Sequence, residues 1–170
     1  INIVNGEDIS FNDYLLNEKE VYNVIRSYIF TNGRPLTKSM LAWWMFQDAS
    51  QELISFDTKL EIEHIFPKKR QENEKSLYDK NNIEKLGNKA LLEKNINIRA
   101  SDYRFEDKVK YYLGFENDKG IHKEGTKDKE LVELAKKYTD YTEQNILDRT
   151  EQIYSEFIKF VKKQNLFKIE

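Results

Sequence analysis

The amino-acid sequence predicts a mainly α-helical domain that carries one small two-stranded β-hairpin. Two patterns predict this fold class. Apolar residues recur at helical spacing in five stretches along the chain, whereas residues 60–67 alternate like a strand and are followed by a second apolar run at residues 86–92. With 170 residues, the chain is long enough to bury a core as one domain.

Two helices are predicted ahead of the strands. Asn17 is a side-chain cap for a helix over residues 18–30, which ends at Asn32-Gly33. Thr37 is predicted to cap a second helix that continues to residue 46. Because this second helix is apolar around most of its circumference, it should be buried between neighbours.

The alternating stretch places His64 at the end of a strand, because Pro67 has no backbone N–H to donate to a neighbouring strand. The residues that follow, 68–82, are strongly polar and lack hydrophobic periodicity. They are typical of a loop or short helix between two strands. The second strand is predicted at residues 86–92, where Gly87 permits a backbone conformation that a side chain would forbid.

Three helices are predicted after the strands. Ser101 or Asp102 caps the first, which Gly114 closes, and a loop follows over residues 117–128. Two closing helices are expected over about residues 129–138 and 143–164, because both stretches repeat apolar residues at helical spacing.

Composition excludes several classes of protein. Cysteine is absent, which excludes disulfides, thiolate chemistry and cysteine-ligated structural zinc. No apolar run approaches the roughly 20 residues that span a bilayer and no signal peptide is recognisable, so we expect a cytoplasmic protein without a membrane span. The net charge is −2, although residues 85–110 hold seven basic and four acidic residues. This balance indicates weak intrinsic affinity for nucleic acid, with targeting supplied by something else.

Several short motifs carry a resemblance to a known family. They are Glu63-His64-Ile65-Phe66-Pro67, then Leu86-Gly87-Asn88 with Leu91-Leu92, then Asn97 nine positions after Asn88, and finally Phe105-Glu106-Asp107-Lys108. This set resembles the HNH nucleases, also called ββα-metal or His-Me finger nucleases. More narrowly, it resembles the nuclease domain at the C-terminus of GmrSD-type restriction proteins. The likeness covers most of the chain from about residue 60 onward and implies a ββα-metal core embedded in a helical domain.

The resemblance implies a metal-dependent endonuclease. His64 suits the general base, because an imidazole with a pKa near 6.5 accepts a proton at neutral pH, and Asn88 is the second catalytic residue, which holds the ring in one tautomer. Glu63 and Asn97 are the implied ligands of a divalent metal, magnesium or manganese, with Asn95 as the competitor of Asn97. A regular strand turns Glu63 and His64 to opposite faces, so this site needs a bulge or a strand end there.

The expected substrate is double-stranded DNA, foreign or modified. Lys89, Arg99 and Lys108 are candidates for phosphate contacts, which add affinity without reading sequence. Because the chain starts at Ile1 without an initiator methionine, we expect the rest of a larger polypeptide, with a targeting or NTP-dependent domain, to direct cleavage. Whether the domain forms a homodimer to cut both strands is left open.

The expected organisation is one domain in three parts. Residues 1–57 form an N-terminal helical segment that packs on the core, residues 58–113 form the ββα-metal nuclease core, and residues 114–170 form the C-terminal helices. The alternative function is a non-catalytic helical module that binds nucleic acid or protein with a degenerate HNH core. The retained His64 favours the nuclease, because a degenerate site has little reason to keep it.

Overall fold

The structure, a computed structural model, describes residues 15–168. Over these residues the chain is mainly helical and carries two antiparallel two-stranded sheets, which confirms the predicted fold class. It divides into two compact units, one of residues 29–151 and one of residues 1–28 with 152–170. The first fourteen residues of the predicted segment 1–57 lie outside the described residues, and the predicted boundaries at residues 57 and 113 stay predictions.

The smaller unit contains α1 (Glu18–Ser27) and the second part of α7 (Glu143–Lys163). α1 begins as predicted, because the Asn17 side chain accepts a hydrogen bond from the backbone N–H of Glu20 at 3.0 Å. It ends earlier than predicted, since Tyr28 already has extended backbone angles. The bounds of α7 agree with the predicted closing helix. No helix among residues 15–168 combines the length and the apolar character needed to cross a membrane.

The larger unit begins its helices with α2 (Pro35–Met45). The predicted Thr37 cap is wrong: the helix starts at Pro35, whose fixed φ suits a first helical turn and whose missing N–H needs no partner there. The Thr37 hydroxyl instead donates to the carbonyl oxygen of Thr31 at 2.8 Å. α2 packs against β2 with Thr37, Met40, Leu41 and Met45 buried. The expectation that the whole helix is buried is wrong, because one side of it is exposed, with Leu36 at 44%.

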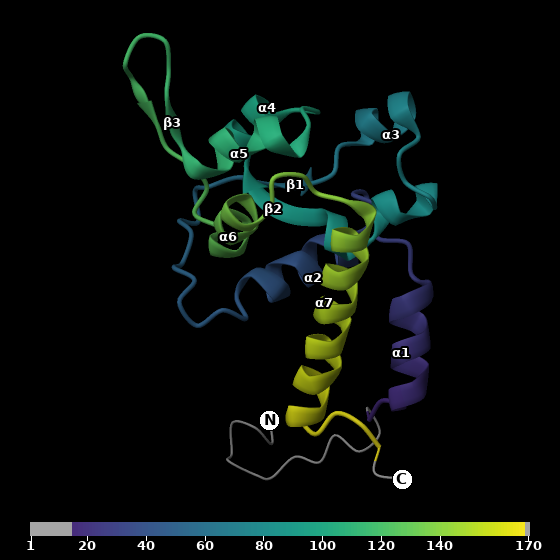
Figure 1. Ribbon diagram of the computed structural model, residues 1–170. Helices are drawn as coiled ribbons and strands as arrows, with labels where there is room; N and C mark the ends of the chain where they lie inside the picture. The colour runs from purple at the N-terminus through teal and green to yellow at the C-terminus, as the bar shows by residue number, and fades with distance from the viewer. Residues whose placement is uncertain (1–14, 169–170) are drawn as a thin grey trace, which may run out of the picture. The chain divides into compact units, whose positions relative to one another are not determined.

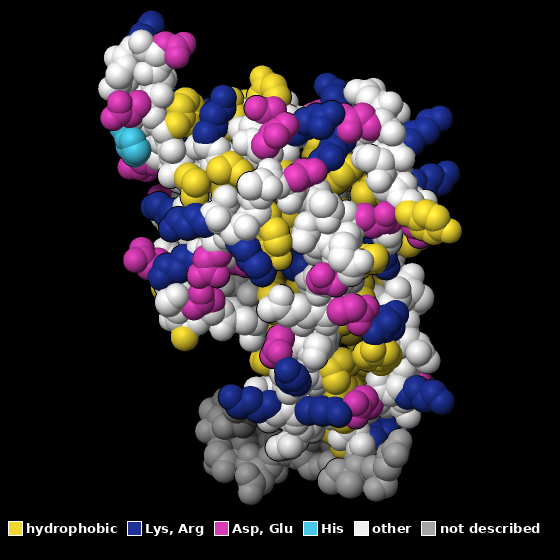
Figure 2. Space-filling model, viewed as in Figure 1, with side chains coloured by type: hydrophobic (Ala, Val, Ile, Leu, Met, Phe, Trp, Pro, Cys, Tyr) yellow, Lys and Arg dark blue, Asp and Glu magenta, His cyan; other side chains and the backbone are white. Residues whose placement is uncertain are grey.

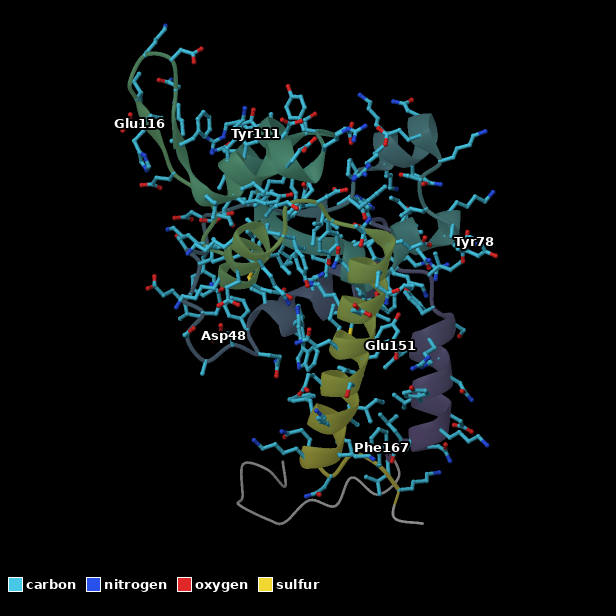
Figure 3. The ribbon with its side chains drawn as sticks, viewed as in Figure 1. Asp48, Tyr78, Tyr111, Glu116, Glu151 and Phe167 are labelled. Atoms are coloured by element: carbon cyan, nitrogen blue, oxygen red, sulfur yellow. The ribbon has the colours of Figure 1, made fainter. Side chains whose placement is uncertain are left out.

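The sheet that organises the larger unit pairs β1 (Leu60–His64) with β2 (Lys89–Glu93) in antiparallel register. β1 ends at His64, as predicted. β2 starts later than predicted, because residues 86–88 form a short 3-10 helix, η3 (Leu86–Asn88). The polar segment between the strands folds as α3 (Lys68–Glu74) and the 3-10 helix η2 (Lys80–Glu84). Tyr78 lies between these helices, fully exposed, and points outward (Figure 3).

Two helices, not one, follow β2: α4 (Lys94–Ala100) and α5 (Phe105–Leu113). The sequence did not predict α4. The predicted cap at Ser101 or Asp102 is wrong. Ser101 has a positive φ of 43° and ends α4, and the residue that precedes α5 is Arg104, whose backbone is extended. Gly114 closes α5 with a φ of 86°, as predicted.

A small hairpin occupies part of the predicted loop 117–128. Its first strand, β3 (Phe115–Glu116), precedes the loop, and its second, β4 (His122–Lys123), lies within it; the hairpin extends away from the helices of the larger unit (Figure 1). α6 (Lys129–Lys137) follows, capped by Asp128. The core of the larger unit lies between the sheet and the helices around it. It contains Ile65, Phe66, Leu92, Ile96, Ala100, Phe105, Tyr112, Leu131, Tyr141 and Ile146.

Candidate active site

The candidate site lies at the end of the β1–β2 ladder. His64, the last residue of β1, is opposite Lys89, the first residue of β2. One further backbone hydrogen bond, from Ile65 N–H to the carbonyl oxygen of Asn88 at 2.9 Å, continues the pairing beyond the strands. The motif around His64 and the motif around Asn88 are therefore neighbours in space, although more than twenty positions separate them in the sequence.

The Asn88 side chain fixes the backbone immediately after His64. Its Oδ1 accepts from Phe66 N–H at 2.7 Å, and its Nδ2 donates to the carbonyl oxygens of Phe66 and Ile83, both at 3.0 Å. The side chain is completely buried. A carboxamide can donate and accept at once, which is why it can substitute for a strand's backbone at this point. All three of these bonds end on backbone atoms, so Asn88 acts on the chain that carries His64.

Gly87 is required by close packing, and the predicted special backbone conformation is wrong. Its φ lies outside the left-handed region that Gly114 and Gly120 adopt. A Cβ at Gly87 would lie 2.0 Å from the carbonyl oxygen of Ile146 and 2.7 Å from the backbone nitrogen of Thr150, both in α7. η3 therefore rests directly on the α7 backbone, which only a residue without a side chain allows.

Arg149 of α7 holds the same segment from the interior. Its Nη1 donates to the carbonyl oxygens of Leu86, Gly87 and Lys89 at 2.8–3.1 Å, and its other nitrogens bind Glu130 at 2.7 and 2.8 Å. Burial acts to lower the pKa of Arg149, but the Glu130 carboxylate more than compensates and raises it. A buried cation thus anchors the start of β2.

The His64 ring is mostly buried and faces a charged pair. Its Nε2 lies 3.2 Å from Lys89 Nζ and 3.9 Å from Glu84 Oε2, and its side chain is 11% exposed. Burial lowers the pKa of His64, and the positive charges of Lys89 and Lys68 lower it further against an opposing effect of Glu84. The imidazole is therefore neutral at pH 7, with one lone pair in the plane of the ring.

The Glu63 carboxylate is buried in a different environment. Its Oε1 accepts from Lys108 Nζ and from the Tyr112 hydroxyl, both at 2.6 Å. Burial raises the pKa of Glu63 against the attraction of Lys108. Lys108 Nζ also donates to the carbonyl oxygen of His64 at 2.7 Å. Glu63 and His64 thus have separate side-chain partners, as the alternation of a strand predicts, and Lys108 ties both to α5.

A hollow of about 190 Å³ nevertheless brings the main predicted residues together, and its lining is Ile62, Glu63, His64, Asn97, Ser101, Asp102 and Lys108. Asn97 enters it from α4, and its Nδ2 donates to Glu61 Oε2 at 3.2 Å, which leaves the amide oxygen outside that bond. Asn95 is exposed and does not line the hollow. All of the lining residues except Ile62 are polar or charged, so the hollow is polar.

The three predicted phosphate contacts have different surroundings. Lys89 is fully buried, and its ammonium group binds Glu84, Asn32 and His64. Lys108 lines the hollow, but it is 1% exposed and bound to Glu63. Arg99 lies outside the hollow, where it donates to the carbonyl oxygens of Asn95 and Glu124, both at 3.2 Å.

Sequence reasoning missed four polar contributors to the site, and one of them is Asp102, which was predicted only as a helix cap and lines the hollow. Glu84 and Asn32 surround Lys89, and they lie in segments without any periodic pattern that could have indicated them. Tyr112 was assigned to the apolar face of its helix. Its spacing of four from Lys108 places both on one side of α5, which is a signal that it shares the Glu63 carboxylate.

The side chains of the hollow offer oxygen donors, the kind that a hard divalent cation prefers. Among residues 15–168, no three His, Cys, Asp or Glu side chains converge on one point. The oxygen-bearing side chains of the hollow that could hold a cation are those of Asn97, Glu63 and Asp102. Magnesium accepts such a set, since it keeps several waters and needs only one or two carboxylates.

Comparison with known proteins identifies the family. No curated protein and no solved structure matches the chain. Residues 16–156 match the family described as GmrSD restriction endonucleases, C-terminal domain. The match covers well over half of the chain, including every motif residue around the hollow. The chain therefore belongs to the family of C-terminal domains of GmrSD restriction endonucleases.

Proposed function

We propose that this restriction-endonuclease domain is a metal-dependent HNH nuclease that hydrolyses phosphodiester bonds of double-stranded DNA. The observation that supports this proposal best is the single hollow lined by His64, Glu63 and Asn97. Hydrolysis of a phosphodiester needs a base for water, a cation for the developing negative charge, and rigid placement of both. The hollow has a candidate for each need.

His64 is the proposed general base. Its lowered pKa keeps the imidazole neutral, so a ring nitrogen can accept a proton from an attacking water. Asn88 and Lys108 are positioning residues, because they hold the backbone on either side of the ring. Asn88 binds Phe66, and Lys108 binds the carbonyl oxygen of His64 itself.

Asn97 and Glu63 are the proposed metal ligands, and Asp102 is added to them because it lines the same hollow. A carboxylate has about four lone-pair positions, so Glu63 can bind a cation while it accepts from Lys108 and Tyr112. The bound cation would supply a Lewis acid for the phosphate and leaving oxygen. Asn97 is preferred to Asn95 because only Asn97 lines the hollow.

Contact with DNA is the remaining part of the proposal. Because Lys89 and Lys108 are themselves buried and each pairs with a carboxylate, we assign both to the organisation of the site, and only Arg99 stays a candidate for a phosphate contact. The rest of a larger polypeptide, with a targeting or NTP-dependent domain, would supply recognition of foreign or modified DNA.

Plasmid nicking tests the proposal. The native chain is compared with His64→Ala in magnesium and in manganese, and His122→Ala is the matched control because His122 is the exposed second histidine. We expect His64→Ala to lose about 10²–10⁴-fold in rate, the usual contribution of a general base, and His122→Ala to lose nothing. Equal rates for all three chains would exclude His64 as the base.

Metal titration tests the ligands separately. Asn97→Ala should raise the concentration of magnesium needed for half-maximal nicking, whereas Asn95→Ala should leave it unchanged. The reverse result would move the ligand to Asn95. A folded native chain that nicks in neither metal would support the alternative, a non-catalytic module that binds nucleic acid or protein.

A further inference from the structure

The environment of Lys89 constrains the tautomer of His64. The side chain of Lys89 has no exposed surface, and three acceptors surround its ammonium group. They are Glu84 Oε2 at 2.6 Å, Asn32 Oδ1 at 2.7 Å and His64 Nε2 at 3.2 Å. An ammonium group has three donors and no lone pair, so each of these contacts must run from lysine to its partner.

The charge on Lys89 decides the direction of the contact with His64. Glu84 is the nearest group of opposite charge, and it also pairs with Lys68 Nζ at 2.6 Å. Burial lowers the pKa of Lys89 and the Glu84 carboxylate opposes that fall, so the contact at 2.6 Å favours the ammonium form. Lys89 therefore donates to Nε2, and the single proton of the neutral ring lies on Nδ1.

We propose that Lys89 is a positioning residue that holds His64 in the Nδ1–H tautomer and occupies the Nε2 lone pair until the site is engaged. This inference rests on the proposed role of His64 as the base. A neutral imidazole has one lone pair in its plane, so His64 can take a proton from water only after the contact with Lys89 is broken. In this arrangement Lys89 masks the proposed base.

Glu84 provides the second half of the arrangement. Its Oε2 lies 3.9 Å from His64 Nε2, too far for a hydrogen bond in the described state but on the same side of the ring. When Lys89 withdraws, the ring proton can move to Nε2 and be donated toward Glu84, which leaves the lone pair of Nδ1 for water. A carboxylate behind an imidazole is a common way to orient a base.

Nitrogen-15 NMR of the imidazoles tests this proposal without metal or DNA. The chain contains only two histidines, His64 and His122, and His122 is exposed in the β3–β4 hairpin, so it reports an unconstrained ring in the same sample. His64→Ala assigns the two sets of signals. The spectra are recorded at about pH 8, where a histidine with a pKa of 6.5 or below is neutral.

We expect Nδ1 of His64 to give the signal of a protonated nitrogen and Nε2 that of an unprotonated one. Lys89→Met keeps the length of the side chain and removes the donor. In this variant Nε2 should give the signal of the protonated nitrogen and Nδ1 that of the unprotonated one. In Lys68→Met, which removes the more exposed partner of Glu84 and keeps the Lys89–Glu84 pair, the native pattern should persist.

A native chain with the proton on Nε2 would overturn the proposal, and this measurement does not depend on whether any variant folds. A folded Lys89→Met variant with the native pattern, or a loss of the native pattern in Lys68→Met, would overturn it as well. The result is independent of the nicking assay, because an inactive domain can show the predicted tautomer and an active one can lack it.

Discussion

Replacing Lys108 with methionine should destabilise the protein strongly, although the change is nearly isosteric. Lys108 is 1% exposed and Glu63 is 4% exposed, and the ammonium group donates at 2.6 Å to the carboxylate. Removal of one partner from a buried ion pair leaves an unpaired charge, which typically costs about 3–5 kcal/mol. Total stabilities of domains are about 5–15 kcal/mol, so the variant should lose a large part of its free energy of unfolding.

The pH dependence of this loss identifies its cause. Burial already raises the pKa of Glu63 above its ordinary value of 4.5, and Lys108 opposes that rise. Without Lys108 the folded-state pKa rises further. A raised pKa gives stability that is fully present below the unfolded value and is lost as pH rises through the folded value. The variant should therefore lose more free energy relative to the native chain at pH 8 than at pH 5.

Urea unfolding at both pH values, followed by circular dichroism, measures the two free energies. The matched control is the double variant Glu63→Gln with Lys108→Met, which removes the second charge and should be more stable than the single variant at pH 8. The reasoning is refuted if the single variant loses less than about 1 kcal/mol, or if single and double variants unfold at the same urea concentration at both pH values.

Three further predictions follow from the packing and charges around the site. Gly87→Ala should lose at least about 2 kcal/mol in urea unfolding, because its Cβ would lie 2.0 Å from a backbone oxygen, whereas Gly33→Ala, with nothing within 4 Å, should change little. Burial raises the pKa of Asp128 from 3.8 to about 7, so its carboxyl stabilises the fold below pH 4 and loses that effect as pH rises through 7. Asp128→Asn keeps a helix cap, so near pH 4 its free energy of unfolding should equal that of the native chain, and at pH 8 it should be higher by up to about 4 kcal/mol. A difference that does not change between the two pH values would contradict this. In DNA-binding measurements against salt, Arg99→Ala should reduce the slope of log K by about 0.9, and Lys89→Met should not change it if that lysine stays interior.

The sequence predicted the elements in which a local signal and the tertiary fold agree. The end of β1 at His64 follows from the alternation before it and from Pro67 behind it. The Asn17 cap and the bounds of α7 follow from side-chain capping and from apolar spacing sustained over many residues. In each case one short-range rule is enough, because no distant contact competes with it.

The sequence could not indicate elements that depend on distant contacts. α4 is only seven residues long and largely polar, and its end depends on the unusual backbone angles of Ser101. The sequence suggested that Gly87 is needed for its backbone conformation. It is needed for close packing against α7, whose contacting residues are some sixty positions away in the sequence. Lys89 and Lys108 looked like surface residues because lysine usually is one, and their burial depends on Glu84 and Glu63 facing them in the fold.

The burial of these two lysines also bears on how such a domain reaches DNA. Residues 85–110 hold seven basic and four acidic residues, yet Lys89 and Lys108 are neutralised inside the larger unit and add little to the field outside it. On the face that Figure 2 shows, basic and acidic side chains are interspersed instead of forming one positive surface. Since non-specific affinity grows with the number of phosphates neutralised, these two lysines add little to it. If the domain cuts DNA as proposed, most of its affinity for the duplex must then come from other residues or from the rest of a larger polypeptide.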